Sequence, residues 1–489
     1  MAFFYFWQIN LLPLLFNSFD FGFFLVICYT LYWCFGTNRR IAQNVLLLLG
    51  SYLFYGLWDW RFLALLLASS LIDFMAGRAL GRTTHKTKRK AWLYTSILWN
   101  LGVLFAFKYF NFFVEGFHQL FATEGVSTTY SIWNVIIPLG LSFYTFQTMS
   151  YTVDVYRKRI GPTGSLLEFL CFVSFFPQLV AGPIERAKFL LPQFQNKRVF
   201  NVEQTKDGLR QILWGLFKKV LVADKLGIAV TMAFENPDQY GALTLAFAAA
   251  LFSFQVYCDF SGYTDIAVGT AKLFGFRLHN NFRIPYLAKS ITEFWQRWHI
   301  TLTNWFTDYV YIPFVKSFKK ITMSSRVLGL LLTMVLVGLW HGANWTFIAF
   351  GLFNGGILAV ERIPFFGKRN TLARWLPTTP LAFSLLYFFA ITSVSSIFFR
   401  SESITQAWAI LSRIFTFTDI WQISSLIGYK LWYLVVLIVA EIATTQKVHP
   451  FQDLQLRIPR PARWAVYYIF ILLIVRYAEP KEAFIYFQF

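Results

Sequence analysis

The sequence predicts an all-α polytopic membrane protein, with about eleven transmembrane helices supplemented by re-entrant and amphipathic helices. Hydrophobic residues make up 57% of the 489 residues, aromatic residues 20% and charged residues only 14%. A soluble chain is about 25% charged, so this chain has too few charges to cover a water-exposed surface. The apolar residues also gather in runs that alternate with basic loops, which is typical of a multi-pass membrane protein.

The net charge of +20 fits basic loops at a membrane surface better than a nucleic-acid interface. We therefore expect membrane lipid as a partner and no nucleic acid.

The four cysteines lie in apolar stretches without a CxxC pair, so we expect buried thiols and no disulfide. The composition also excludes a disordered chain, collagen, a coiled coil and a small secreted disulfide domain.

The basic clusters order the first five apolar runs. These runs cover residues 21–35, 41–58, 62–76, 92–113 and 132–153. A basic cluster follows the first, third and fifth run, so two crossings separate each cluster from the next. All three clusters then lie on one side of the membrane, as cytoplasmic loops should. This order predicts an N-terminus outside the cytoplasm.

The C-terminal half is interpreted in the same way. Its apolar runs are predicted at residues 327–340, 347–360, 381–399, 431–442 and 464–475. Arginines at 457, 460 and 463 precede the last run and are expected in the cytoplasm, so the tail is predicted to be extracytoplasmic. The last run is short against the roughly 20 residues of a normal span. A locally thinned bilayer or packing between helices would accommodate it.

The expected organisation has four parts. They are N-terminal transmembrane helices at 1–160, a core with amphipathic and re-entrant segments at 161–362, C-terminal transmembrane helices at 363–478, and the tail at 479–489. Apolar runs within 161–311 alternate with Pro, Gly and polar residues, which membranes tolerate only inside protein or beside a water-filled cavity. This region is therefore the expected wall of an internal site. Residues 204–230 are predicted to form an interfacial amphipathic helix carrying five basic residues: Lys206, Arg210, Lys218, Lys219 and Lys225.

Two of the six histidines lie inside aromatic, apolar segments, and His299 is the first. If its segment is one helix, Trp295, His299 and Thr303 share a face. Glu293 and Arg297 are then spaced for an i,i+4 ion pair.

The second histidine, His341, ends an apolar run and is flanked by Gly338 and Gly342. An ionisable residue inside a membrane segment is a functional-site hypothesis by default. The alternative for each histidine taken alone is a structural residue whose hydrogen bonds are satisfied inside the protein.

Three sequence blocks besides the two histidine segments form a joint pattern, at residues 175–184, at 259–265 with a continuation at 275–276, and at 281–286. The pattern resembles the membrane-bound O-acyltransferases, in particular the bacterial branch of alginate O-acetyltransferase subunits. That branch includes acetyl exporters for peptidoglycan and cellulose and the D-alanine exporter for teichoic acid. The resemblance is strong over residues 175–356 and weaker through the N-terminal runs.

The resemblance implies helices around a central tunnel, with the acyl donor entering from the cytoplasm. It implies that His341 is the catalytic histidine and that His299 is a second active-site residue. Further candidates for the oxyanion site or the tunnel lining are Asn304, Asn344, Trp298 and Trp340. The chain departs from the family pattern at Thr307, after Pro313 and at Asn354, which leaves the acceptor open.

The last six residues carry an FxYxxF pattern centred on Tyr486. This pattern resembles the acyl-carrier peptide of the D-alanine export system, which implies that Tyr486 receives the acyl group. The alternative is an aromatic anchor at the membrane interface.

The resemblance implies an enzyme of the bacterial inner membrane, and the basic clusters predict that both of its termini are extracytoplasmic. Acetyl-CoA is the expected donor substrate, with no bound cofactor and no metal, because the histidines lack ligands at metal spacing. The final acceptor is an extracytoplasmic polysaccharide, with alginate the first choice and peptidoglycan or cellulose next, reached through a periplasmic SGNH-type acetyltransferase partner. The alternatives are a transporter or channel without acyl transfer, and a structural scaffold that leaves His341 unexplained.

Overall fold

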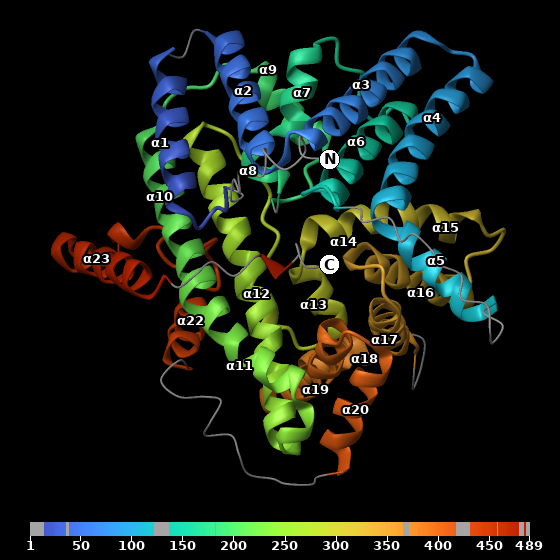
Figure 1. Ribbon diagram of the computed structural model, residues 1–489, viewed down its shortest axis with the longest axis vertical. Helices are drawn as coiled ribbons and strands as arrows, with labels where there is room; N and C mark the ends of the chain where they lie inside the picture. The colour runs from blue at the N-terminus through green and yellow to red at the C-terminus, as the bar shows by residue number, and fades with distance from the viewer. Residues whose placement is uncertain are drawn as a thin grey trace, which may run out of the picture. The chain divides into compact units, whose positions relative to one another are not determined.

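The computed structural model describes residues 14–35, 39–121, 136–180, 182–364, 371–416, 431–456, 458–478 and 484–485. Regular structure within these ranges is helical, apart from one isolated β-bridge between Pro364 and Thr371. The predicted all-α class is confirmed. The chain divides into two compact units whose boundaries fall inside α10 (Val202–Leu216) and α12 (Ala242–Leu273), both drawn in Figure 1.

Six described helices are long and apolar enough to cross a membrane. They are α2 (Arg40–Asp59), α3 (Arg61–Arg82), the helix over Lys86–Gly116, α12, α16 (Met323–His341) and α19 (Leu381–Arg400). Two shorter apolar helices are α1 (Phe19–Cys34) and α22 (Leu431–Ala443). The chain is thus a multi-pass membrane protein, while the count of about eleven crossings and the four-part division stay predictions.

The fifth predicted run begins later than expected. We expected it from residue 132, but residues 136–140 are not helical and α6 covers Leu141–Tyr156. Gly140 precedes α6 with a positive φ of 69°, and a Cβ there would meet the carbonyl oxygen of Leu179. Only glycine fits this left-handed backbone and this close approach without strain, so the helix begins after it.

Unit 1 consists of Met1–Phe107, Val135–Leu209 and Ile266–Leu278. Besides α1, α2, α3 and α6, it contains α4 (Lys86–Leu104), α7 (Leu166–Ser174), α8 (Phe176–Leu179) and α9 (Ala187–Gln195). Helices α3, α4 and α6 lie side by side in this unit (Figure 1). They share one buried carboxylate, Asp73, which accepts hydrogen bonds from Ser96, from Asn100 Nδ2 at 2.8 Å and from Thr152 Oγ1 at 3.1 Å. These bonds satisfy a polar group that would otherwise destabilise the bundle.

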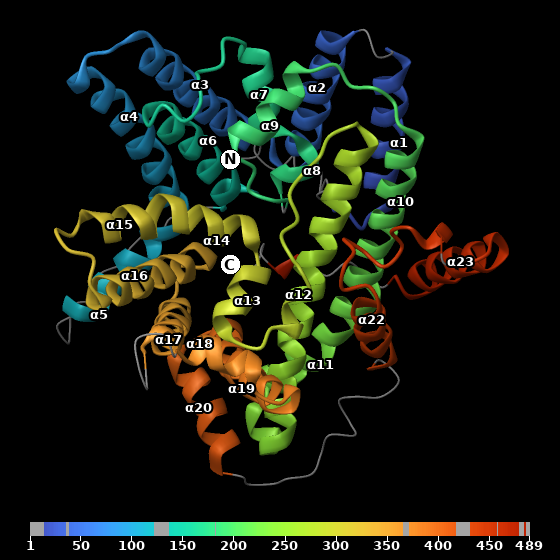
Figure 2. The same cartoon turned by 180° about the vertical axis from the view of Figure 1, so that it is seen from behind.

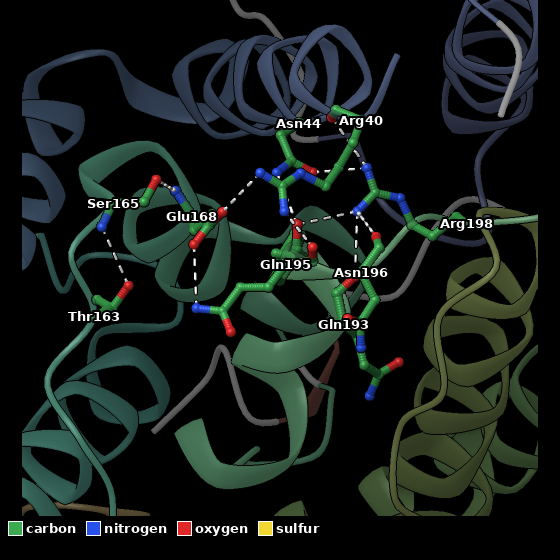
Figure 3. A network of polar contacts seen from close by, with 10 residues as sticks. Arg40, Asn44, Thr163, Ser165, Glu168, Gln193, Gln195, Asn196 and Arg198 are labelled. Carbon is green, nitrogen blue, oxygen red and sulfur yellow. Dashed lines mark hydrogen bonds and ion pairs between the residues drawn. The ribbon is translucent and has the colours of Figure 1, made fainter. Parts of the chain in front are cut away.

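A buried arginine joins two other helices of unit 1 (Figure 3). The guanidinium of Arg198 donates to Asn44 Oδ1 on α2 at 2.8 Å, and to the carbonyl oxygens of Gln193 and Phe194 at 3.2 and 3.4 Å. The amide of Asn44 donates to the same carbonyl of Phe194 at 3.0 Å. The C-terminal carbonyls of α9, which have no partners within the helix, are therefore held against α2.

We expect Arg198→Met to destabilise unit 1, because the carbonyls at the end of α9 lose charged donors. Hydrogen bonds to a charged group contribute roughly 1.5–3 kcal/mol, so we expect a loss of about 2 kcal/mol. Thermal unfolding of detergent-solubilised protein measures the change. The matched control is Lys197→Met at the neighbouring exposed position. Equal melting temperatures for the two variants would contradict the assignment.

Unit 2 consists of Lys108–Asn134, Arg210–Asp265 and His279–Phe489. Its helices up to α16 are α5 (Phe110–Phe121), η2 (Phe217–Ala223), α11 (Asp224–Glu235), η3 (Pro237–Gln239), η4 (Pro285–Leu287), α13 (Ile291–Arg297), α14 (Ile300–Phe306), η5 (Thr307–Tyr311), α15 (Ile312–Ser317) and α16. After α16 follow α17 (Trp345–Arg362), α18 (Leu372–Trp375), η6 (Leu376–Thr378), α19, α20 (Ile404–Thr416), α22, η8 (Leu454–Leu456) and α23 (Arg460–Tyr477). Helix η1 (Phe105–Tyr109) contains the boundary between the units. Helices α16 and α17 pack together as a hairpin, as Figure 2 shows.

The predicted interfacial helix at 204–230 is only partly correct. Lys206 is exposed, but Lys218 and Lys219 are 3% and 1% exposed. Lys218 pairs with Asp265, and Lys219 pairs with Asp259 at 2.6 Å. Both aspartates lie within α12. A buried lysine needs such a partner, so these lysines belong to the core and not to a membrane-facing surface.

Candidate active site

His341 is the last residue of α16 and is buried. The carbonyl oxygens at this helix end have external donors. Lys108 Nζ donates to the carbonyls of Trp340 and His341 at 2.6 and 3.0 Å, and the Tyr109 hydroxyl donates to that of Leu339 at 2.9 Å. These bonds satisfy carbonyls that the helix leaves without partners, and they fix the backbone that carries the imidazole.

His299 lies where the helix that we expected is broken. Helix α13 ends at Arg297, α14 begins at Ile300, and His299 between them has a left-handed backbone with φ of 41°. The predicted helical face of Trp295, His299 and Thr303 is therefore wrong. The predicted ion pair of Glu293 and Arg297, within α13, is confirmed at 2.6 Å.

An upstream segment holds this break in place. The carbonyl of Asn281 accepts from the backbone N–H of Ile300 at 2.9 Å, and its side-chain oxygen accepts from the Thr301 hydroxyl at 2.6 Å. The N–H of Arg283 donates to the carbonyl of Arg297 at 3.0 Å. These bonds replace helical ones and stabilise a conformation that a non-glycine residue rarely adopts, as is common at functional sites.

The rings of both histidines lie close to one indole ring. The ring centroid of Trp340 is 5.5 Å from that of His299 and 5.0 Å from that of His341. His299 is fully buried, and its ring is 4.6 Å from that of Phe260. Two causes lower the pKa of His299 well below its usual value. Burial has the larger effect, and the proximity of His341 has the smaller one. The imidazole of His299 is therefore neutral at physiological pH.

His341 borders a mainly aromatic cavity of about 60 Å³. The lining residues are Phe252, Ser253, Val256, Tyr286, Phe294, Trp295, Trp298, His341, Phe350, Asn354, Thr392, Ser395, Ser396 and Phe399. The hydroxyls of Ser253 and Ser396 lie 2.7 Å apart, and Asn354 Nδ2 donates to Ser395 Oγ at 2.8 Å. An apolar cavity with a few grouped polar atoms suits a small acyl group better than a charged ligand.

The other predicted site residues have different positions. Trp298 lines the cavity, and the ring of Trp340 lies close to both histidine rings. Asn304 is exposed, and neither it nor Asn344 lines the cavity. Asn344 instead caps α17, where its side-chain oxygen accepts from the N–H of Thr346 at 3.0 Å. We therefore retain neither asparagine as a candidate oxyanion donor, and Tyr486 lies outside the described residues.

Trp295 and the hydroxyl residues were not identified from the sequence as cavity-lining groups. The indole Nε1 of Trp295 is buried and has no hydrogen-bond partner within the described residues. Thr392, Ser395 and Ser396 recur at helical spacing on the apolar α19, a pattern that would have indicated a polar stripe facing the protein interior.

A second, polar cavity of about 340 Å³ lies in the same unit. Basic side chains from Lys218, Arg283 and Lys447 line it, together with the carboxylates of Asp265 and Glu441. The hydroxyl of Tyr257 donates to Glu441 at 2.6 Å. This cavity, unlike the one at His341, is suited to a charged ligand.

Comparison with known proteins assigns the chain to a family. Residues 1–403 match the family described as MBOAT, membrane-bound O-acyltransferase. A probable alginate O-acetylase of Pseudomonas putida is 38% identical over 409 residues, which cover 82% of this chain and 80% of the relative. A peptidoglycan O-acetyltransferase of Helicobacter pylori is 31% identical over 416 residues, covering 80% and 76%. A teichoic acid D-alanyltransferase of Bacillus subtilis is 30% identical over 272 residues, covering 52% and 67%.

The helical fold and these similarities define a multi-pass membrane enzyme that transfers acyl groups to oxygen. The chain belongs to the membrane-bound O-acyltransferase family. The predicted family resemblance is confirmed. The chain is therefore interpreted as an O-acyltransferase rather than as a transporter, a channel or a structural scaffold.

Proposed function

We propose that the chain moves an acetyl group from cytoplasmic acetyl-CoA across the bacterial inner membrane, for O-acetylation of an extracytoplasmic polysaccharide. The observation that carries the proposal is the pair of buried histidines around Trp340, one of which borders an acyl-sized cavity. Alginate is the first choice of polysaccharide, because the relatives named probable alginate O-acetylases are 36–38% identical and the peptidoglycan relative is 31% identical.

The proposed reaction begins with the acetyl thioester in the cavity beside His341. A hydroxyl oxygen attacks the carbonyl carbon, His341 accepts the hydroxyl proton, the new C–O bond forms, and the C–S bond breaks. The leaving thiolate, whose conjugate acid has a pKa of roughly 8.5, then takes a proton from solvent or from the imidazolium. General base catalysis of this kind contributes about 10²–10⁴ in rate.

Two further groups support the transition state in this proposal. His299, whose ring lies beside that of Trp340, orients the thioester or donates to the oxyanion. The indole N–H of Trp295 is a second donor, because it lines the cavity and has no protein acceptor among the described residues. A donor already fixed in place needs no reorganisation when charge develops, so it stabilises the transition state more than the ground state.

The polar cavity is the proposed site for the charged part of the donor. Coenzyme A carries phosphate groups, and Lys218, Arg283 and Lys447 supply positive charge around the cavity. Residues 444–450 of its lining precede the arginines expected in the cytoplasm, so the positive-inside rule also supports a donor entering from that side.

Tyr486 is the proposed acceptor of the acetyl group, and both termini are proposed to be extracytoplasmic. A periplasmic SGNH-type acetyltransferase would then move the group to the polysaccharide. The described end of the tail supports this relay, because Phe484 is buried 5.7 Å from the ring of Phe260, which contacts His299.

The test supplies isotopically labelled acetyl-CoA to inverted membranes and measures the intact mass of the C-terminal peptide. We expect one acetyl group on Tyr486 in the unmodified chain and none in Tyr486→Phe, since phenylalanine lacks the attacking oxygen. Tyr477→Phe is the control within the same peptide region and should keep the label. Acetylation of the polysaccharide with no label on Tyr486 would eliminate the relay.

A further inference from the structure

The described end of the tail is part of the core of unit 2. Phe484 is fully buried, and its ring centroid lies 4.4 Å from that of Tyr263 on α12. Ile485 is 5% exposed. A chain end usually frays unless specific contacts hold it, so the burial of both residues indicates a docked segment.

One side chain binds the backbone of this segment. The N–H of Ile485 donates to Asp259 Oδ2 at 2.8 Å. The other oxygen of the same carboxylate, Oδ1, lies 2.6 Å from Lys219 Nζ. Lys219 also pairs with Asp224 Oδ1 at 2.8 Å. Asp259 therefore connects the tail to a buried ion-pair network.

Helix α12 places this contact next to the candidate active site. Asp259 and Tyr263 are four residues apart on the helix, so they share the face that receives the tail. The intervening ring of Phe260 is 5.7 Å from Phe484 and 4.6 Å from His299. One aromatic ring thus separates the docked segment from the second histidine.

We propose that Asp259 is a positioning residue, which holds the C-terminal segment beside the histidines by accepting the backbone hydrogen bond of Ile485. A hydrogen bond to the main chain fixes the position of the tail, and it does not depend on which side chain residue 485 carries. Tyr486 is the next residue in the chain. The purpose of this positioning rests on the proposed acetylation of Tyr486. The docking itself is independent of that chemistry.

Hydrogen–deuterium exchange of the full chain in lipid nanodiscs tests the contact at the Ile485 amide. We expect this amide to exchange about tenfold faster in Asp259→Ala, because a charge-assisted bond is lost. Asp259→Asn keeps an acceptor oxygen and should show a smaller increase, and it carries the test if the alanine variant does not fold. Asp224→Asn is the matched control, since Asp224 pairs with the same lysine without contacting Ile485.

Labelling of Tyr486 in the same variants separates the two proposals. We expect Asp259→Ala to lower the label about tenfold while Asp224→Asn retains it. Faster amide exchange in Asp259→Ala, with no label on Tyr486 even in the unmodified chain, would support the docking by Asp259. The same result would contradict the proposed acetylation of Tyr486. An Ile485 amide whose exchange is unchanged in Asp259→Ala, or equally accelerated in Asp224→Asn, overturns the role of Asp259 whether or not Tyr486 is labelled.

Discussion

His341→Ala is expected to lower acetyl transfer by about 10²–10⁴-fold, since it removes the proposed base at the cavity. The hydroxyl proton then has no acceptor within the apolar lining, and the protonated attacking group is a poor nucleophile. Transfer of label from acetyl-CoA in membranes measures the effect. His341→Gln should be similarly inactive, because an amide keeps much of the polarity and volume but does not accept a proton at neutral pH.

The control for this prediction is His85→Ala, at an exposed residue that caps α4 without a side-chain hydrogen bond. It should retain full activity. Melting temperatures of the His341 variants should stay within a few degrees of the unmodified protein, which would show that the loss is chemical. Unchanged acetylation in His341→Ala would refute the catalytic assignment.

Much of the candidate site could be predicted because ionisable residues are rare inside apolar segments. His299 and His341 stood out on that basis, and the structure places both of their rings close to that of Trp340. The ion pair of Glu293 and Arg297 was predictable for a different reason, since residues four apart in a helix lie on neighbouring turns of the same face.

Features that depend on distant segments were not predictable in this way. The break at His299 depends on bonds from Asn281, and helical periodicity within the segment carries no information about them. Lys218 and Lys219 fit an amphipathic surface helix by pattern, yet their partners lie on α12, which a local pattern does not reveal. Asn344 was assigned to chemistry from its place in a family block, whereas its side chain caps a helix.

Gly351→Ala should destabilise the protein, although alanine is the better helix former. A Cβ at this position of α17 would contact the backbone of α16, including Val335 Cα at 2.8 Å and the carbonyl of Met334. Backbone atoms do not move aside as a flexible side chain does, so the two helices must separate. Overpacking of this kind costs about 1–3 kcal/mol, and we expect about 3 kcal/mol here.

The same separation should lower activity, because α16 carries His341 at its end and α17 contributes Phe350 and Asn354 to the cavity. Gly356→Ala is the matched control on α17, since a Cβ there meets nothing within 4 Å. It should be neutral or stabilising by up to about 1 kcal/mol through helix propensity. Gly351→Ala is thus expected to lower the melting temperature, whereas Gly356→Ala is expected to leave it unchanged or to raise it. A shift of equal sign and size would show that close backbone packing at Gly351 does not hold His341 in place.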